Sequence, residues 1–370
     1  MYTMGQIQHR LSFFGRTIWD EGAGAMFMNW TGSGFEMVFE AKRVEVSFLA
    51  IETVFEPEGV LWPCISVFLD DREKPLAEIL LDREAQCCTL FESASPEKHR
   101  LRVIKRSEND KGKVGVAGIR VEGELLPIET PAKKLCLEFI GDSITCGFGN
   151  EAQNRDCGFL TKEENGLKAY GAVAAALLNA HYYNISVSGI SLCQPMEPDF
   201  SLKVPGHPEL SVKMKAMEDY YGFTDRLHEE ARGKKDGFAE WDFSKHKPDA
   251  IVVNLGTNDS YRIKASRYKL MEIVHFEQRY RAFIHKLRQL NGERAVICCT
   301  MGSMDYYLYD NIVDVVRSYK AQTKDERIFC YKFGGIFPIE EGYGAGDHPS
   351  VITHQRMGEE LAATLRQWIA

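Results

Sequence analysis

The sequence lacks the long apolar runs that mark a membrane protein. No apolar run approaches the ~18 residues that a membrane-spanning helix needs. Residues 1–17 also lack the apolar central stretch of a secretory signal peptide. We therefore expect a cytoplasmic protein without a membrane partner, or a secreted one if a signal has been trimmed from the chain.

An excess of positive charge is also missing. The net charge is −8, so the chain has no excess of basic residues that would bind nucleic acid or an anionic membrane. Two charged stretches, residues 105–113 and 228–237, mix both signs, a pattern typical of solvated loops. We therefore expect no nucleic-acid partner and predict that both stretches face solvent.

The ten cysteines lack the spacings that disulfide frameworks and zinc sites use. None is part of a CxxC pair, and a chain of 370 residues is long enough to build its cores without disulfides. Cys136, Cys298 and Cys299 fall in strand-like runs, where a free thiol behaves as a small buried hydrophobic group. We therefore expect neither disulfides nor a structural metal.

The first 128 residues have no long helical periodicity. Turn signals separate short runs of β-branched and aromatic residues, which indicates a β-sandwich. The predicted strands are AMFMNW, GFEMVFEA, VEVSFLAI, CISVFLD, AEILL, CCTLF, HRLRVIK and VGVAGIRVEG. The segment 124–134, which carries Pro127 and Pro131, is the predicted linker.

From Lys134 onward, strand-like runs alternate with helix-like runs. This alternation indicates a parallel sheet flanked by helices. The chain length also favours two domains, which we place at residues 1–128 and 134–370. Helices are expected near 166–180, 268–290, 311–322 and at the C-terminus, and strands at 135–141, 184–189, 250–256, 294–302 and 327–333.

The second domain places the residue types of acyl transfer at successive strand ends. LCLEFIGDS ends at Ser143, the next strand-like run ends before Gly189, a third ends before Asn258, and His348 precedes the last helix-like segment. Each alone is ordinary turn or cap chemistry. Open α/β sheets, however, bind ligands at the carboxyl ends of their strands, and acyl transfer needs a nucleophile, a base and oxyanion donors. The combination favours an ester hydrolase.

These motifs resemble a known superfamily. GDSIT, the Gly189 loop, GTND and DHP occur in the order found in SGNH (GDSL-like) hydrolases. GDSITCGFGNE, with GRT at 15–17 and WTGSGFEMVFEAKRVEV at 30–46, is more similar to carbohydrate esterase family two, whose members remove acetyl groups from sugars. The resemblance covers nearly the whole chain. It implies a jelly-roll β-sandwich followed by a flavodoxin-like α/β/α hydrolase domain.

The resemblance implies roles for four of these residues. Ser143 is expected to be the nucleophile and His348 the general base, since an imidazole with a pKa of about 6.5 suits a base near neutral pH. The backbone amides of Ser143 and Gly189 and the side-chain amide of Asn258 are the expected oxyanion donors. A serine at a helix start and a glycine without a Cβ are suited to bringing backbone N–H groups close to a substrate.

The third member of a catalytic triad is where the chain departs from the superfamily. The usual aspartate three residues before the histidine is replaced by Ala345, and the nearest acid is Asp347. Adjacent side chains of an extended chain point to opposite faces, so Asp347 is a doubtful partner for His348. The resemblance implies a Ser–His dyad, with a main-chain carbonyl orienting the imidazole.

The remaining candidates lie around this centre. Asp142 and Asp259 each follow a strand end, where a carboxylate can hold backbone N–H groups and fix a loop. The candidate substrate contacts, which could equally be simple packing, are Tyr220, Tyr221, Met301, Met304 and Tyr306.

The resemblance implies an O-acetyl esterase that acts on plant-derived oligosaccharides of the xylan or mannan type through an acetyl-serine intermediate, with no metal or organic cofactor. Two alternatives stay open. The same motifs serve lipid esterases and thioesterases, and the β-sandwich could make the chain a carbohydrate-binding protein with an inert hydrolase domain. The sequence does not predict the oligomeric state.

Overall fold

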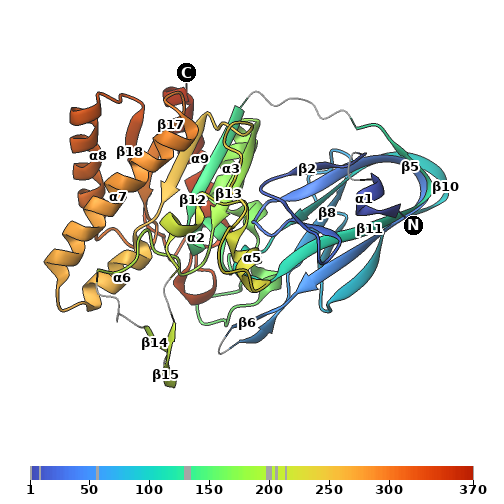
Figure 1. Cartoon of the computed structure of the whole chain (residues 1–370), viewed down its shortest axis with the longest axis horizontal. Coiled ribbons are helices and arrows are strands. Elements are labelled where there is room, and N and C mark those ends of the chain that lie inside the picture. Colours follow the sequence, from blue (N-terminus) through green and yellow to red (C-terminus); the bar gives the residue numbers. More distant parts are fainter. Residues whose placement is uncertain are drawn as a thin grey trace.

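The computed structural model describes residues 2–7, 10–55, 58–128, 135–196, 202–204, 207–212 and 215–369. An N-terminal domain of antiparallel strands lies beside a C-terminal α/β domain (Figure 1), as the sequence predicts. The last strand of the first domain ends at Leu126 and the first strand of the second begins at Leu135. Residues 129–134 of the predicted linker lie outside the described residues.

The N-terminal domain is built on one nine-stranded antiparallel sheet with the central order β3-β4-β11-β5-β10-β8-β9. Strands β1 and β2 pair with β11 and β5, and β6 and β7 form a separate hairpin. The elements are β1 (Tyr2–Thr3), α1 (Met4–Ile7), β2 (Ser12–Phe14), β3 (Ile18–Asp20), β4 (Ala25–Phe27), β5 (Gly34–Ile51), β6 (Thr53–Phe55), β7 (Gly59–Leu61), β8 (Cys64–Leu69), β9 (Ala77–Leu80), β10 (Ala85–Lys105), η2 (Asn109–Lys111) and β11 (Lys113–Leu126).

The central strands of this domain, β5, β10 and β11, are longer than the sequence predicts. Two predicted strands merge into β5 and two others into β10. The β5–β10 register shifts between Thr89 and Phe91 and between Glu92 and Glu97. Extra residues at such β-bulges bend a strand without ending it. One hydrophobic core collects side chains from β5, β8, β10 and β11, so the bent sheet encloses its own core.

The C-terminal domain has a parallel five-stranded sheet with the order β13-β12-β16-β17-β18. Its elements are β12 (Leu135–Gly141), α2 (Ser143–Cys146), η3 (Thr161–Glu163), η4 (Gly166–Lys168), α3 (Tyr170–Leu177), β13 (Ala180–Ser186), β14 (Leu202–Val204), β15 (His207–Val212), α4 (Met217–Tyr220), α5 (Arg226–Ala231), β16 (Ala250–Asn254), α6 (Thr257–Ala265), α7 (Lys269–Asn291), β17 (Val296–Met301), α8 (Tyr309–Thr323), β18 (Ile328–Lys332), η5 (Ala345–Asp347) and α9 (Val351–Ile369).

Successive side chains of each strand point to opposite faces of this sheet, so it has a hydrophobic core on each face. In β16, Val253 belongs to the core that includes side chains of α7 and α8. Its neighbour Val252 belongs to the core that includes side chains of α3 and α9. Strands buried on both faces read as continuous apolar runs, which is why the sequence reveals them. None of the described helices is long and apolar enough to cross a membrane, and all ten cysteines are free.

Buried polar contacts join the two domains. Arg16 of the first domain forms an ion pair of 2.9 Å with Glu138 of β12, and both side chains are buried. Asn29 and Asn109 donate hydrogen bonds to the buried carboxylate of Asp225, at 2.7 and 3.0 Å. Because breaking such contacts would leave buried charges without partners, the interface fixes how the domains sit against each other.

Candidate active site

Three neighbouring strands end side by side at one edge of the parallel sheet. Gly141 of β12 pairs with Ser186 of β13 on one side and with Asn254 of β16 on the other. The segments that follow carry Ser143, Gly189 and Asn258. The strand order therefore brings the predicted nucleophile between the two segments that carry its predicted oxyanion donors, which agrees with the sequence-based placement.

Ser143 is the first residue of helix α2. Asp142 caps this helix: its side-chain oxygen accepts a hydrogen bond of 3.1 Å from the backbone N–H of Ile144. Burial, and the nearby charge of Asp259, raise the pKa of the Asp142 carboxyl to about 7. Asp142 was predicted to hold backbone N–H groups with its carboxylate, and the bond from Ile144 is of this kind.

The loop before α9 carries His348 back to Ser143. The backbone N–H of Ala345 donates to Gly149 O at 3.0 Å, and that of Val351 donates to Asn150 O at 3.1 Å. Gly149 has a φ of +53°, and a Cβ there would lie 2.5 Å from the Ala345 Cβ. This contact therefore requires glycine.

Ser143 and His348 form a hydrogen-bonded pair. The distance from Ser143 Oγ to His348 Nε2 is 2.8 Å across 205 residues of sequence. His348 Nδ1 lies 3.1 Å from both Ala345 O and Gly346 O. A carbonyl can only accept, so Nδ1 carries the proton and Nε2 is free to accept one from the serine. Burial lowers the pKa of His348, which favours this neutral form.

Asp347 does not contact the His348 ring. Its carboxylate forms an ion pair with Arg155, and both side chains are about half exposed. Asp347 has a φ of +64°, so the loop turns here instead of running extended. The doubtful third triad member is thus directed elsewhere, although the reason differs from the extended chain assumed in the sequence analysis.

The predicted oxyanion donors lie on the two flanking segments. Gly189 is exposed with a φ of +76°, a conformation that favours glycine. The side-chain nitrogen of Asn258 lies 2.9 Å from Ile190 O and 3.5 Å from a carboxylate oxygen of Asp142. These contacts direct the Asn258 amide toward both the Gly189 loop and the start of α2.

Two family models together span most of the chain. Residues 137–361 match the GDSL-like lipase/acylhydrolase model, and residues 13–131 match the N-terminal domain of carbohydrate esterase 2. The chain belongs to the GDSL-like lipase/acylhydrolase family. The predicted superfamily is thereby confirmed, as is an N-terminal domain like that of family two carbohydrate esterases.

Several known proteins are similar to this chain over nearly its whole length. The cellulase/esterase CelE of Acetivibrio thermocellus is 29% identical over 91% of this chain, which spans only 37% of that protein's length. An acetylxylan esterase/glucomannan deacetylase of Cellvibrio japonicus is 24% identical over 92% of this chain and 85% of its own. The structure of a family two carbohydrate esterase from Clostridium thermocellum in complex with cellohexaose aligns with a TM-score of 0.78 and 27% identity. The alignment covers 96% of this chain and 98% of that one.

Asp259 fixes the loop beside the Ser143–His348 pair of this GDSL-like domain. Its fully buried carboxylate accepts a hydrogen bond of 2.8 Å from the backbone N–H of Leu192 and lies 3.4 Å from the Arg262 guanidinium. The loop-holding role predicted for Asp259 therefore agrees with its contacts.

Three of the predicted substrate contacts are wrong, because the side chains are buried. Tyr221 is fully buried, and its hydroxyl donates to Glu138 at 2.5 Å. Tyr220 is also buried and donates to Glu230 at 3.2 Å. Met301 is fully buried at the end of β17 and belongs to the hydrophobic core. These residues pack the domain instead of facing a ligand.

The other two candidates keep part of their surface exposed. Met304 packs against the core beneath α3 and α9. The Tyr306 hydroxyl donates to Phe333 O at 2.9 Å and its ring stays half-buried. A substrate contact by either residue stays a prediction.

The charged stretch 105–113 is not a solvated loop, which corrects the sequence-based expectation. It lies between the domains, and Lys105, Glu108, Asn109 and Lys113 are all buried. The Lys105 ammonium donates to the carbonyls of Ser107 and Glu108, at 2.8 and 2.5 Å. The stretch 228–237 is buried only at its start, at His228 and Glu229.

Glu108 and Phe148 were missed by the sequence analysis. Glu108 accepts a hydrogen bond of 2.6 Å from the backbone N–H of Ser188, next to Gly189. The Phe148 ring lies 4.5 Å from the His348 ring, measured between centroids. Phe148 lies in the GDSITCGFGNE string that carries the resemblance. Glu108, by contrast, stands in a mixed-charge run that gives no signal of burial.

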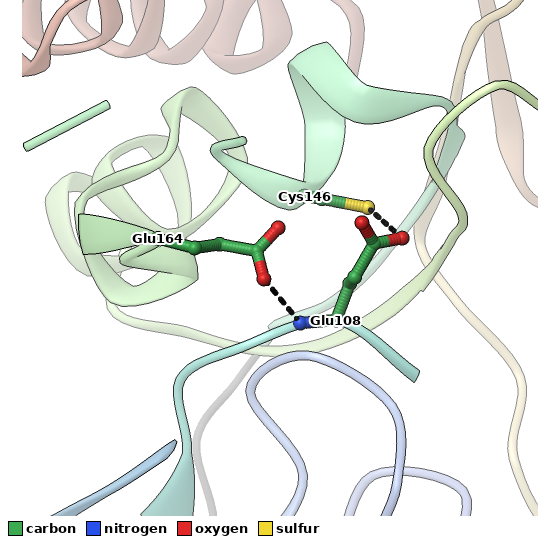
Figure 2. A group of neighbouring side chains, drawn as sticks. All are labelled: Glu108, Cys146 and Glu164. Carbon is green, nitrogen blue, oxygen red and sulfur yellow. Dashed lines mark hydrogen bonds between the residues drawn. The ribbon is translucent and has the colours of Figure 1, made fainter. Parts of the chain in front are cut away.

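One group of described side chains has metal-binding chemistry. The ligand atoms of Glu108, Cys146 and Glu164 lie within 4.8 Å of one another (Figure 2). Burial raises the pKa of the Cys146 thiol well above its ordinary value, which disfavours the thiolate that a metal would bind. One oxygen of each carboxyl group already accepts a backbone hydrogen bond. These contacts identify a hydrogen-bonding cluster, and the proposed reaction draws on no metal.

Proposed function

We propose that this protein is a serine esterase that releases acetate from acetylated oligosaccharides of the plant xylan or mannan type. The observation that carries the proposal is the 2.8 Å contact between Ser143 Oγ and His348 Nε2, with the other ring nitrogen held by two carbonyl oxygens. The activities for which the Cellvibrio relative is named, acetylxylan esterase and glucomannan deacetylase, support the substrate class.

The first step forms an acetyl-serine. His348 Nε2 takes the proton of the Ser143 hydroxyl as Oγ bonds to the acetyl carbon, and the carbonyl electron pair moves onto oxygen. The backbone amides of Ser143 and Gly189 and the Asn258 side chain stabilise this oxyanion. When the intermediate collapses, the bond from the acetyl carbon to the sugar oxygen breaks, and the sugar leaves with the proton from His348.

The second step returns the free enzyme. His348 Nε2 takes a proton from water, whose oxygen bonds to the acetyl carbon, and a second oxyanion forms at the same donors. The acyl bond to Ser143 then breaks, acetic acid leaves, and the serine regains its proton from His348. A dyad suffices because the Ala345 and Gly346 carbonyls hold the imidazole in the tautomer that both steps require.

Acetate release from defined acetylated xylo- and manno-oligosaccharides, followed by NMR, tests this proposal. Wild-type protein should release acetate, and Ser143→Ala, as the matched control, should not. Release by neither protein would refute the esterase and favour a carbohydrate-binding protein with an inert hydrolase domain.

The family model also covers lipases, so acyl length must be tested separately. Turnover of p-nitrophenyl acetate, butyrate and octanoate distinguishes the two substrate classes. The proposal expects acetate to be hydrolysed fastest. A clear preference for butyrate or longer chains would instead favour a lipid esterase.

A further inference from the structure

Glu108 extends from the N-terminal domain into the catalytic domain. The residue follows β10, is fully buried, and its carboxylate reaches two segments of the second domain. Oε2 accepts a hydrogen bond of 2.6 Å from the backbone N–H of Ser188 and lies 3.6 Å from Cys146 Sγ (Figure 2). Ser188 directly precedes Gly189, and Cys146 ends the helix that Ser143 begins. One carboxylate therefore touches both segments that carry the proposed backbone oxyanion donors.

The loop around Gly189 has no regular structure to fix its peptide planes. Its backbone is held by a few separate hydrogen bonds: Val187 N–H to Gly141 O at 3.3 Å, Ile190 N–H to Val187 O at 3.2 Å, Ser191 N–H to Lys215 O at 3.1 Å, and Leu192 N–H to Asp259 at 2.8 Å. These partners belong to the second domain. Among the described hydrogen bonds of residues 187–192, only the one to Glu108 comes from the first domain.

Glu108 is itself held firmly. Its backbone N–H donates to Glu164 at 2.9 Å, and its carbonyl accepts from the Lys105 ammonium at 2.5 Å. In Figure 2 the carboxyl group of Glu164 points toward the backbone nitrogen of Glu108, and the carboxyl group of Glu108 points toward Cys146. Burial, and after it the charge of Glu108, raise the pKa of Glu164 well above its ordinary value. Both effects disfavour the charged form of Glu164.

We propose that Glu108 is a positioning residue for the oxyanion site. It holds Ser188 and the end of α2 so that the amides of Gly189 and Ser143 face the same point. The inference rests on the proposed esterase function. It makes the N-terminal domain part of the catalytic centre and not only an accessory surface. Displacing an oxyanion donor reduces turnover because such donors act on the transition state more than on the bound substrate.

Three substitutions of Glu108 separate the effect of its side-chain length and acceptor oxygen from the effect of its charge. Glu108→Gln keeps an oxygen that can accept from Ser188, so its kcat should stay within about threefold of wild type. Glu108→Asp keeps the charge but shortens the side chain, and Glu108→Ala removes the acceptor. Both should lower kcat by about tenfold to 100-fold, approaching the loss of an oxyanion donor, while KM for p-nitrophenyl acetate changes little.

Glu164→Gln is the matched control. It alters the same buried cluster without touching the Gly189 loop, so it should lower the melting temperature and leave kcat per active site unchanged. Active sites are counted by titration with a p-nitrophenyl phosphonate, which reacts once with the serine. Each rate then refers to folded, competent enzyme only.

The inhibition constant (Ki) of methylboronic acid distinguishes a positioning role from a merely structural one, because loss of stability alone would not change it. This compound adds to serine as a tetrahedral anion, so its Ki should rise in Glu108→Asp and Glu108→Ala by the factor that kcat falls. The inference would be overturned if Glu108→Asp changed neither kcat per active site nor Ki. It would also be overturned if Glu164→Gln lost as much kcat per active site as the Glu108 variants do. If Glu108→Ala does not fold, the Asp and Gln variants decide. Wild-type protein without esterase activity would refute the proposed function instead.

Discussion

The carboxylate of Asp347 forms an ion pair with Arg155, although His348 is its neighbour in sequence. His348 Nδ1 instead lies 3.1 Å from two carbonyl oxygens. An exposed ion pair contributes little to stability, about 0–1 kcal/mol, so the Asp347 carboxylate is neither a structural necessity nor part of the proton path.

Asp347→Asn should therefore keep turnover of p-nitrophenyl acetate within about tenfold of wild type. Loss of a true triad carboxylate costs about 10,000-fold in serine proteases. Arg155→Gln is the control, because it releases the Asp347 carboxylate without removing it and should also be mild. A collapse of turnover in folded Asp347→Asn would show that this carboxylate orients His348 during the reaction.

The pH dependence of kcat/KM should report the protonation of His348. Burial lowers its pKa, and only the neutral ring can accept the serine proton. The rate should therefore fall as pH drops, with a midpoint below the ordinary imidazole value of about 6.5. Rates between pH 4.5 and 8, with melting temperatures in the same buffers, would measure this midpoint.

Asp142 must be separated from His348 in that profile, because its pKa of about 7 places it in the same range. Asp142→Asn keeps a good helix cap and removes the titration. The acid limb should persist in this variant. A limb that disappears with Asp142, or a midpoint above 6.5, would contradict the assignment of His348 as the base.

Ser143→Ala tests the nucleophile directly. The change removes one oxygen at a half-buried position, so the fold should be retained while acetate release falls to background. Circular dichroism and the melting temperature provide the control for folding. Turnover comparable to wild type would exclude Ser143 as the nucleophile.

Much of the catalytic domain could be predicted because its strands are buried on both faces. The runs ending near Gly141 and Asn254 are mostly apolar, with Glu138 as the exception, and the polar residues after them mark the sheet edge that carries the site. The pairing of His348 with Ser143 could not be predicted from local sequence patterns. It followed from the resemblance, since no local pattern links residues that are 205 positions apart.

The errors share a physical cause, which is that burial by tertiary contacts leaves no local signal in the sequence. Glu108 and Lys105 lie in a mixed-charge run that resembles a solvated loop, yet the domain interface buries both. Tyr221 combines an apolar ring with a hydroxyl that could equally bind a sugar or, as found, Glu138. Periodicity and composition cannot separate these outcomes, because tertiary contacts decide them.

Asn258 offers a test of the oxyanion site that is independent of Glu108. Its amide nitrogen lies 2.9 Å from Ile190 O, beside the Gly189 loop. Asn258→Ala should lower kcat by about 100-fold to 1,000-fold, the usual effect of losing one such donor, with a smaller change in KM. A kcat within threefold of wild type would remove Asn258 from the oxyanion site.

The buried ion pair between Arg16 and Glu138 predicts how strongly the two domains depend on each other. The guanidinium lies 2.9 Å from the carboxylate and also donates to Tyr221 O at 2.6 Å. Arg16→Met should destabilise the protein by about 3–5 kcal/mol, because it leaves the Glu138 charge buried without its partner.

The double variant Arg16→Met/Glu138→Gln should recover much of this loss, since it also removes the stranded charge. Thermal unfolding followed by calorimetry would measure both changes, and it would also show whether the domains melt together. If Arg16→Met alone leaves the melting temperature unchanged, the pair does not hold the interface. If the double variant is no more stable than Arg16→Met, the cost arises from lost packing of Arg16 against the Tyr221 and Trp241 rings and not from a buried charge.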